Sequence, residues 1–160
     1  MKYGRKAMRQ FNLTILIAIL LMTLTCNQTS KSNNSTVKQQ PDNSISNNLD
    51  FLKELNGKYP YQVKLFKKSA FTKRLKKLIG NSRYRFLKKT WAVEVPMEVE
   101  NNIFVAIACQ AHNCDCTNFI IVVDFSKNLM YVGIKEEGEI KTYSEDGSYS
   151  PNLNEWVNSY

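Results

Sequence analysis

The second half of the chain is a series of five short apolar segments separated by polar connections, and this pattern restricts the fold more than any other feature. Three of the four connections are only about three residues long, which is too short for a parallel crossover, so neighbouring strands must be antiparallel. Pro96 inside the first segment predicts an edge strand or a bulge, because proline cannot donate a ladder hydrogen bond. The predicted strands cover residues 91–99, 103–109, 119–125, 129–135 and 139–143.

Helical spacing precedes these strands. Phe71, Leu75 and Ile79 recur on one side of a predicted helix, and Gly80 supplies a stop before a second, shorter helix. The sequence therefore predicts an α+β, two-layer fold in which N-terminal helices pack on a five-stranded antiparallel sheet, followed by a short C-terminal helix. The helical segments expected are 50–55 (a single turn), 67–80, 83–89 and 152–160.

The N-terminal region has the order of an export signal. Four basic residues within the first ten are followed by an apolar run over 11–22, too short to span a bilayer comfortably. Cys26 lies just after this run and resembles the lipid-bearing first residue of a bacterial lipoprotein, although Thr23 and Thr25 depart from the usual pattern. The alternatives are an uncleaved anchor, or ordinary cleavage that leaves Cys26 free.

Three regions follow from this order. Residues 1–25 are a predicted lipoprotein signal peptide, 26–49 a polar tether with too few apolar residues for a core, and 50–160 a single folded domain. We expect a protein of the periplasm or cell envelope, attached to a membrane through a lipid on Cys26.

Charge is divided sharply along the domain. Residues 53–90 contain 13 Lys and Arg and one acid, Glu54, whereas residues 91–160 contain 11 Asp and Glu and three Lys. A basic helical face in an exported chain without a stacking-aromatic motif does not indicate nucleic-acid binding. We interpret it as a solvated face, with contact to anionic envelope polymers or phospholipid headgroups as the alternative.

One connection between predicted strands is unusual in length and composition. It contains the only histidine of the chain and three of its four cysteines. Exported thiols usually form disulfides, and the spacing of Cys109 and Cys114 suits a bridge across the neck of the loop. Closing so short a loop constrains the unfolded chain by only about 2 kcal/mol, so its main effect is to hold the loop in one shape. Cys116 is then a buried thiol, an intermolecular bridge or the true partner of Cys109.

The same cysteines and histidine are also compatible with other kinds of site. Cys109, His112, Cys114 and Cys116 are four candidate metal ligands, but their spacing matches no common structural zinc pattern. An envelope metal-binding or thiol-redox protein is therefore the alternative function. An enzyme is less well supported, since no residue that would orient a nucleophile and no cofactor motif accompanies the loop. We expect neither a catalytic site nor a cofactor.

The motif Cys-Gln-Ala-His-Asn-Cys over 109–114, with the strands at 119–125 and around Tyr131, resembles the Ivy family of inhibitors of vertebrate lysozyme. The similarity extends over about residues 59–156. It implies a helix-plus-five-strand fold, an envelope location and often a homodimer. It also implies that the loop is the inhibitory element, that Cys109 and Cys114 form its disulfide, and that His112 reaches the catalytic carboxylates of c-type lysozyme. The inhibitory loop then consists of Cys109, Gln110, Ala111, His112, Asn113, Cys114 and Asp115.

This chain departs from the better-known family loop, which has Lys-Pro before the histidine and an acid after it. Here Gln110, Ala111 and Asn113 occupy these positions, so the target is either c-type lysozyme or a bacterial lytic transglycosylase. An imidazole suits a lysozyme-type target, because its two ring nitrogens can bridge the two nearby carboxyl groups of a retaining glycosidase. The acidic second half of the domain would favour approach to a basic lysozyme.

Overall fold

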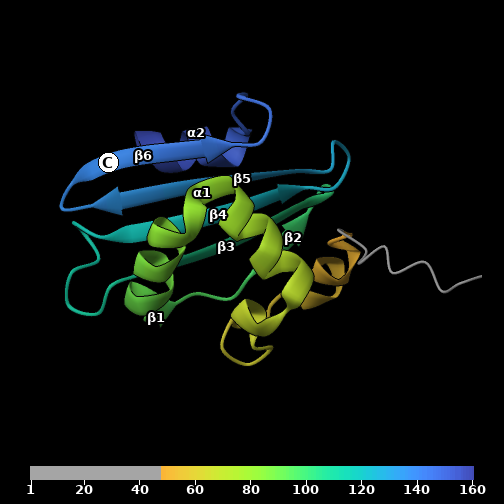
Figure 1. The fold of residues 1–160 in the computed structure, drawn as a ribbon, viewed down its shortest axis with the longest axis horizontal. Coiled ribbons are helices and arrows are strands. Elements are labelled where there is room, and N and C mark those ends of the chain that lie inside the picture. Colours follow the sequence, from red (N-terminus) through yellow and green to blue (C-terminus); the bar gives the residue numbers. More distant parts are fainter. Residues whose placement is uncertain (1–47) are drawn as a thin grey trace, which may run out of the picture. The chain divides into compact units, whose positions relative to one another are not determined.

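The computed structural model describes residues 48–160 (Figure 1). The predicted signal peptide, Cys26 and nearly all of the predicted tether lie outside the described residues. Leu49, which we assigned to the tether, is instead part of the hydrophobic core, with 1% of its surface exposed. The folded unit therefore starts slightly before residue 50.

A mixed set of helices and strands makes up this unit. Two short 3-10 helices come first, then a long helix, six strands and a final helix. Their bounds are η1 Asp50–Leu55, η2 Leu65–Lys67, α1 Ser69–Thr90, β1 Val93–Glu94, β2 Glu98–Glu100, β3 Ile103–Cys109, β4 Asn118–Asp124, β5 Leu129–Glu136, β6 Glu139–Ser144 and α2 Pro151–Asn158.

The sheet is antiparallel throughout, in the order β1-β3-β4-β5-β6, and β2 also pairs with β3. The single first strand that we predicted is thus two short edge strands. Residues 95–97, which include Pro96, separate them. The amide of Val95 still donates to the carbonyl of Ile107 over 3.4 Å, whereas Met97 turns into the core and its amide donates to the carbonyl of Lys58. This is the interruption expected where a proline lies in an edge strand.

Helix α1 bends at Gly80, whose φ of 79° and ψ of 160° are not helical. Glycine accommodates a positive φ without the steric cost that a Cβ atom would add. The two helical halves on either side agree with the two helices predicted from the sequence. The first half begins at Ser69, later than expected, because the preceding residues form the 3-10 turn η2.

Both faces of the sheet are covered. Helix α1 contributes Phe71, Leu75 and Leu87 to the large core on one face, and α2 packs Leu153 and Trp156 on the opposite face (Figure 1). Alternate residues of β3, β4 and β5 point into the two cores, as strand geometry requires. The predicted α+β class is confirmed.

Close packing of the Trp156 indole against Gly133 of β5 fixes the position of α2. A Cβ atom at Gly133 would lie 2.4 Å from Cζ3 of Trp156, so only glycine leaves room for the indole on β5. Within residues 48–160, every buried core side chain belongs to residues 49–156, and these described residues form one compact unit. A chain of residues 42–160 thus keeps every core contact and is expected to fold alone. Within residues 48–160, no helix has the length and apolarity needed to cross a bilayer.

Candidate functional site: the loop between β3 and β4

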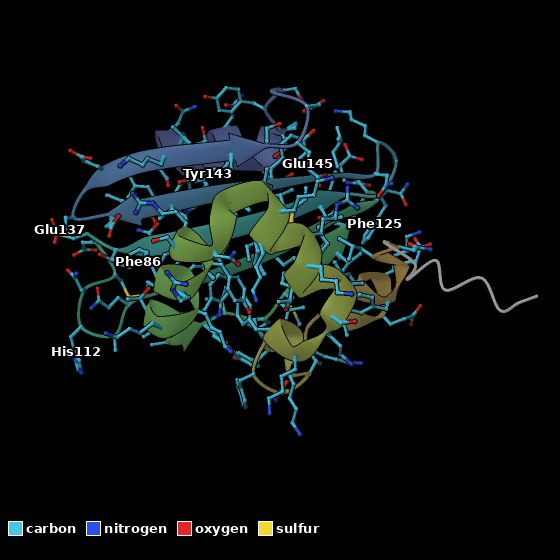
Figure 2. The ribbon with its side chains drawn as sticks, in the orientation of Figure 1. Phe86, His112, Phe125, Glu137, Tyr143 and Glu145 are labelled. Carbon is cyan, nitrogen blue, oxygen red and sulfur yellow. A yellow bond between two sulfur atoms is a disulfide. The ribbon has the colours of Figure 1, made fainter. Side chains whose placement is uncertain are left out.

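The candidate site is the connection of residues 110–117, which projects from one end of the sheet (Figure 2). Strands β3 and β4 pair along their whole length, from Ile103 with Asp124 to Cys109 with Asn118. The loop therefore starts and ends on two adjacent, fully paired residues. A rigid pair of strands holds both ends of the loop.

A disulfide joins Cys109, the last residue of β3, to Cys114 within the loop, with Cα atoms 4.9 Å apart. It encloses the four residues that include His112. Cys116 is exposed and carries a free thiol, so it is neither the buried thiol nor the partner of Cys109 that we also considered.

Backbone hydrogen bonds shape the loop on both sides of the disulfide. The amide of Gln110 donates to the carbonyl of Thr117 over 3.0 Å, which continues the β3–β4 ladder by one step. The amide of Asn113 donates to the carbonyl of Gln110 over 3.0 Å, and the amide of Thr117 donates to the carbonyl of Asn113 over 2.8 Å. Two consecutive tight turns result, with His112 in the first.

The side chain of Asn113 stabilises this arrangement from inside the loop. Its Nδ2 donates to Oε1 of Gln110 and to Oγ1 of Thr117, each over 3.2 Å. Thr117 is buried, with 2% of its surface exposed. The residue next to His112 is thus bonded to both ends of the loop.

Asn118, the first residue of β4, is a further contributor that the sequence analysis missed. Only 2% of its surface is exposed, and its Nδ2 donates to the carbonyl of Cys114 over 2.9 Å. The only sequence signal was a polar residue directly before an apolar strand, which is common in proteins. The tertiary contact is what gives this asparagine its role.

His112 lies at the tip of the loop, and Figure 2 shows its side chain pointing away from the domain. The residue is exposed and has a φ of 61°. This left-handed conformation costs a residue other than glycine about 1–2 kcal/mol, so the surrounding bonds and the disulfide must maintain it. No hydrogen bond or ion pair within residues 48–160 engages the imidazole, so both ring nitrogens are open to a partner.

Three exposed acidic residues lie in the loop and in or just after the neighbouring β5–β6 turn. Asp115 is exposed next to the disulfide, and Glu137 and Glu139 are exposed in and after the β5–β6 turn at the same end of the sheet (Figure 2). The amide of Gly138 donates to the carbonyl of Cys116 over 3.0 Å and so connects this turn to the loop. We call Asp115, Glu137 and Glu139 the acidic rim. The acidic charge of this half is evident from the sequence, but the proximity of these three residues depends on the fold.

The C-terminal residue also lies near the rim. Nζ of Lys135 is 3.8 Å from the centroid of the Tyr160 ring. Partial burial raises the pKa of the Tyr160 phenol, a hydrogen bond with Ser159 acts in the opposite direction, and the charge of Asp115 raises the pKa further. The C-terminus and the loop therefore share one end of the molecule.

The arrangement argues against a metal centre in the loop. Two of the four candidate ligands, Cys109 and Cys114, are consumed by the disulfide. In the part of the chain that the structure describes, no group of three or more His, Cys, Asp or Glu side chains is placed to hold a metal ion.

Together, the fold and the loop define a class of protein that presents a rigid, disulfide-closed loop with one exposed imidazole at its tip. A family model described as "Inhibitor of vertebrate lysozyme (Ivy)" matches residues 70–160, more than half of the chain, and the chain belongs to this family. Searches of curated proteins and of solved structures each gave no match.

Membership of this family implies lysozyme inhibition, with lysozyme as the partner. It is consistent with our expectation that the chain is not an enzyme, and with a location outside the cytoplasm.

Proposed function

We propose that this protein inhibits a c-type lysozyme or a related muramidase by inserting residues 109–115 into the active-site cleft, where His112 contacts the catalytic carboxyl groups. The observation that carries the proposal is the position of His112. It is exposed at the tip of a disulfide-closed loop, and its imidazole has no partner within residues 48–160.

The chemistry of the target supports this role. Retaining glycosidases use two carboxyl groups about 5 Å apart, one of which is kept protonated by its surroundings. A neutral imidazole offers one donor and one acceptor, and a protonated imidazole offers two donors. The side chain can therefore pair with both carboxyl groups, and it contains no glycosidic bond that they could cleave.

Preorganisation supports tight binding. The loop is restrained by the disulfide, by the amide of Asn113 and by the bond from Asn118 to Cys114. A loop that already has its bound shape loses little conformational entropy when it enters a concave site. The acidic rim adds long-range attraction to a basic target.

The proposed location is the cell envelope, with a lipid on Cys26 and residues 26–49 as the tether. The order of basic, apolar and small polar residues before Cys26 supports this part of the proposal. A tethered inhibitor would stay close to the wall that it protects.

The decisive experiment measures inhibition of a vertebrate c-type lysozyme in a cell-wall turbidity assay, using residues 42–160. We expect His112→Ala to weaken inhibition by roughly 30-fold or more, the loss typical of a central interface residue. Asn101→Ala is the matched control. Asn101 is also exposed with a left-handed φ of 50°, but it lies in the turn before β3, at the other end of that strand.

A second variant separates chemistry from preorganisation. Cys109→Ser combined with Cys114→Ser retains the imidazole and should weaken inhibition less than His112→Ala does. Equal inhibition by wild type and His112→Ala would refute the proposed role of the imidazole. If neither protein inhibits lysozyme, the same pair is tested against bacterial lytic transglycosylases, and inactivity there would reject the proposed function.

A further inference from the structure

The outer side of α1 is strongly basic in both of its halves. Phe71, Leu75 and Leu87 pack toward the sheet, so the residues on the opposite side of each half face away from it (Figure 2). Six of these outward residues are basic and exposed: Lys73, Lys76, Lys77, Arg85, Lys88 and Lys89.

Three more exposed lysines, Lys64, Lys67 and Lys68, lie in and around η2 immediately before α1. We call these nine residues the lysine face. No acidic residue occurs in the chain between Glu54 and Glu94. The local charge is therefore entirely positive over this whole stretch.

None of the nine forms an ion pair within residues 48–160, whereas the two other basic residues of α1 do. Arg74 is paired with Glu145 over 2.6 Å, and Arg83 is paired with Glu136. The nearby acids are thus already engaged by arginines that hold α1 to the sheet. The lysine face retains its charge for an external partner.

A hollow of about 270 Å³ opens at the edge of the lysine face, where Lys64, Lys67 and Lys88 lie around it. Its apolar walls include Leu65 and Trp91. Glu94 also lines it, but its carboxylate accepts from Nε1 of Trp91 and from the amide of Tyr61, each over 2.9 Å. Tyr61 lies at the hollow with 66% of its surface exposed.

We propose that the lysine face docks the folded domain on an anionic phospholipid surface. Eight of its nine residues are lysines, which are attracted to anionic headgroups as point charges, each contributing a similar increment of binding. Recognition of nucleic acid or of a phosphorylated peptide would favour arginine, whose planar fork binds phosphate in a bidentate manner. The exposed Tyr61 beside an apolar hollow suits the membrane interface, where aromatic side chains with a polar tip accumulate.

Docking through this face is compatible with an accessible loop. The lysine face belongs to η2, α1 and the residues between them, whereas His112 lies in the β3–β4 loop and projects from the end of the sheet (Figure 2). The inference does not depend on what the loop binds.

The test is cosedimentation of residues 42–160 with phosphatidylcholine vesicles that contain about one-third phosphatidylglycerol. Lys73→Gln, Lys77→Gln and Lys88→Gln are combined in one variant. Each lysine near an anionic surface accounts for about fivefold in affinity, so the triple variant should bind roughly 100-fold more weakly. The matched control combines Lys53→Gln, Lys127→Gln and Lys141→Gln, which remove the same charge from exposed residues outside the lysine face.

The proposal is supported if the first variant loses binding while the control variant stays within about threefold of wild type, and if neutral phosphatidylcholine vesicles bind none of the three proteins. An equal loss of vesicle binding in both variants would show that binding responds to net charge alone and would overturn the proposal. Binding to isolated peptidoglycan but not to anionic vesicles would also overturn it, in favour of a wall polymer. Near-ultraviolet circular dichroism establishes that each variant is folded.

Discussion

The side-chain amide of Asn118 donates a hydrogen bond of 2.9 Å to the carbonyl oxygen of Cys114. This contact joins the buried first residue of β4 to the second cysteine of the loop disulfide. The loop is therefore fixed covalently to β3 through Cys109 and non-covalently to β4 through Asn118. Its orientation is set by two strands of the sheet.

We predict that Asn118→Ala weakens inhibition of lysozyme by roughly threefold to tenfold, because one hydrogen bond of this type contributes about 0.5–1.5 kcal/mol. The disulfide and His112 remain in place, so the loss reflects looser orientation of the loop. Inhibition constants and thermal unfolding midpoints measured together test this. Full inhibition at a lowered midpoint would show that Asn118 serves stability only.

Glu137 should act on the rate of association. It is exposed at the tip of the β5–β6 turn, at the same end of the sheet as His112 (Figure 2). We predict that Glu137→Gln slows association with a basic lysozyme by about twofold to fivefold at low salt, with little change in dissociation, because rim charges mainly steer encounter. Surface plasmon resonance separates the two rates.

Glu155→Gln is the control for this prediction, since it removes the same charge from an exposed residue of α2. An equal effect of both variants would mean that net charge, not the acidic rim, guides association.

Gly133 should be required for the packing of α2. A Cβ atom there would lie 2.4 Å from the indole of Trp156 and 2.7 Å from Cγ2 of Ile120. We predict that Gly133→Ala lowers the free energy of unfolding by about 1–3 kcal/mol, the usual cost of overpacking a core. Urea unfolding measures it. In a Trp156→Leu background the penalty should shrink, and an unchanged penalty would locate the clash elsewhere.

Asp146 should make stability depend on pH in the acid range. Hydrogen bonds from Ser144 and from the amide and hydroxyl of Ser148 lower the pKa of its carboxyl from 3.8 to about 2. A lowered pKa means that the charged form stabilises the folded state. This contribution is complete above pH 3.8 and is lost as the pH falls toward about 2.

We therefore predict that wild type is more stable than Asp146→Asn at neutral pH and that the difference narrows as the pH falls below 3.8. Urea unfolding of both proteins across this range tests the prediction. A difference that is constant with pH would contradict a role for the charge of Asp146.

Much of the fold was predictable because its signals are local. The helical spacing of Phe71, Leu75 and Ile79 indicated the first half of α1, and Gly80 indicated the break. The short connections indicated an antiparallel sheet, which is confirmed. The split of the first predicted strand into β1 and β2 was only partly foreseen. Pro96 suggested an interruption, but the burial of Met97 depends on contacts distant in sequence.

Part of the candidate site could likewise be predicted from the sequence and part could not. The concentration of His112 with Cys109 and Cys114 in one loop was visible in the sequence, because chemically unusual residues were close together there. Asn118 and Glu137 were not singled out, since asparagine and glutamate are ordinary at strand ends and in turns. Asn118 matters to the loop through its hydrogen bond to Cys114, and Glu137 lies near the loop because the β5–β6 turn is hydrogen-bonded to Cys116.

The α+β class, the two helical halves of α1 and the loop with its single imidazole could all be read from the sequence, because periodicity, turn length and residue chemistry act between near neighbours. Two features could be seen only in the folded domain: α2 covers the second face of the sheet, and the β5–β6 turn is hydrogen-bonded to the loop. These features depend on packing between segments far apart in the chain. Such packing depends on how side-chain shapes fit together and on how much apolar surface becomes buried, and a local sequence pattern does not reveal either.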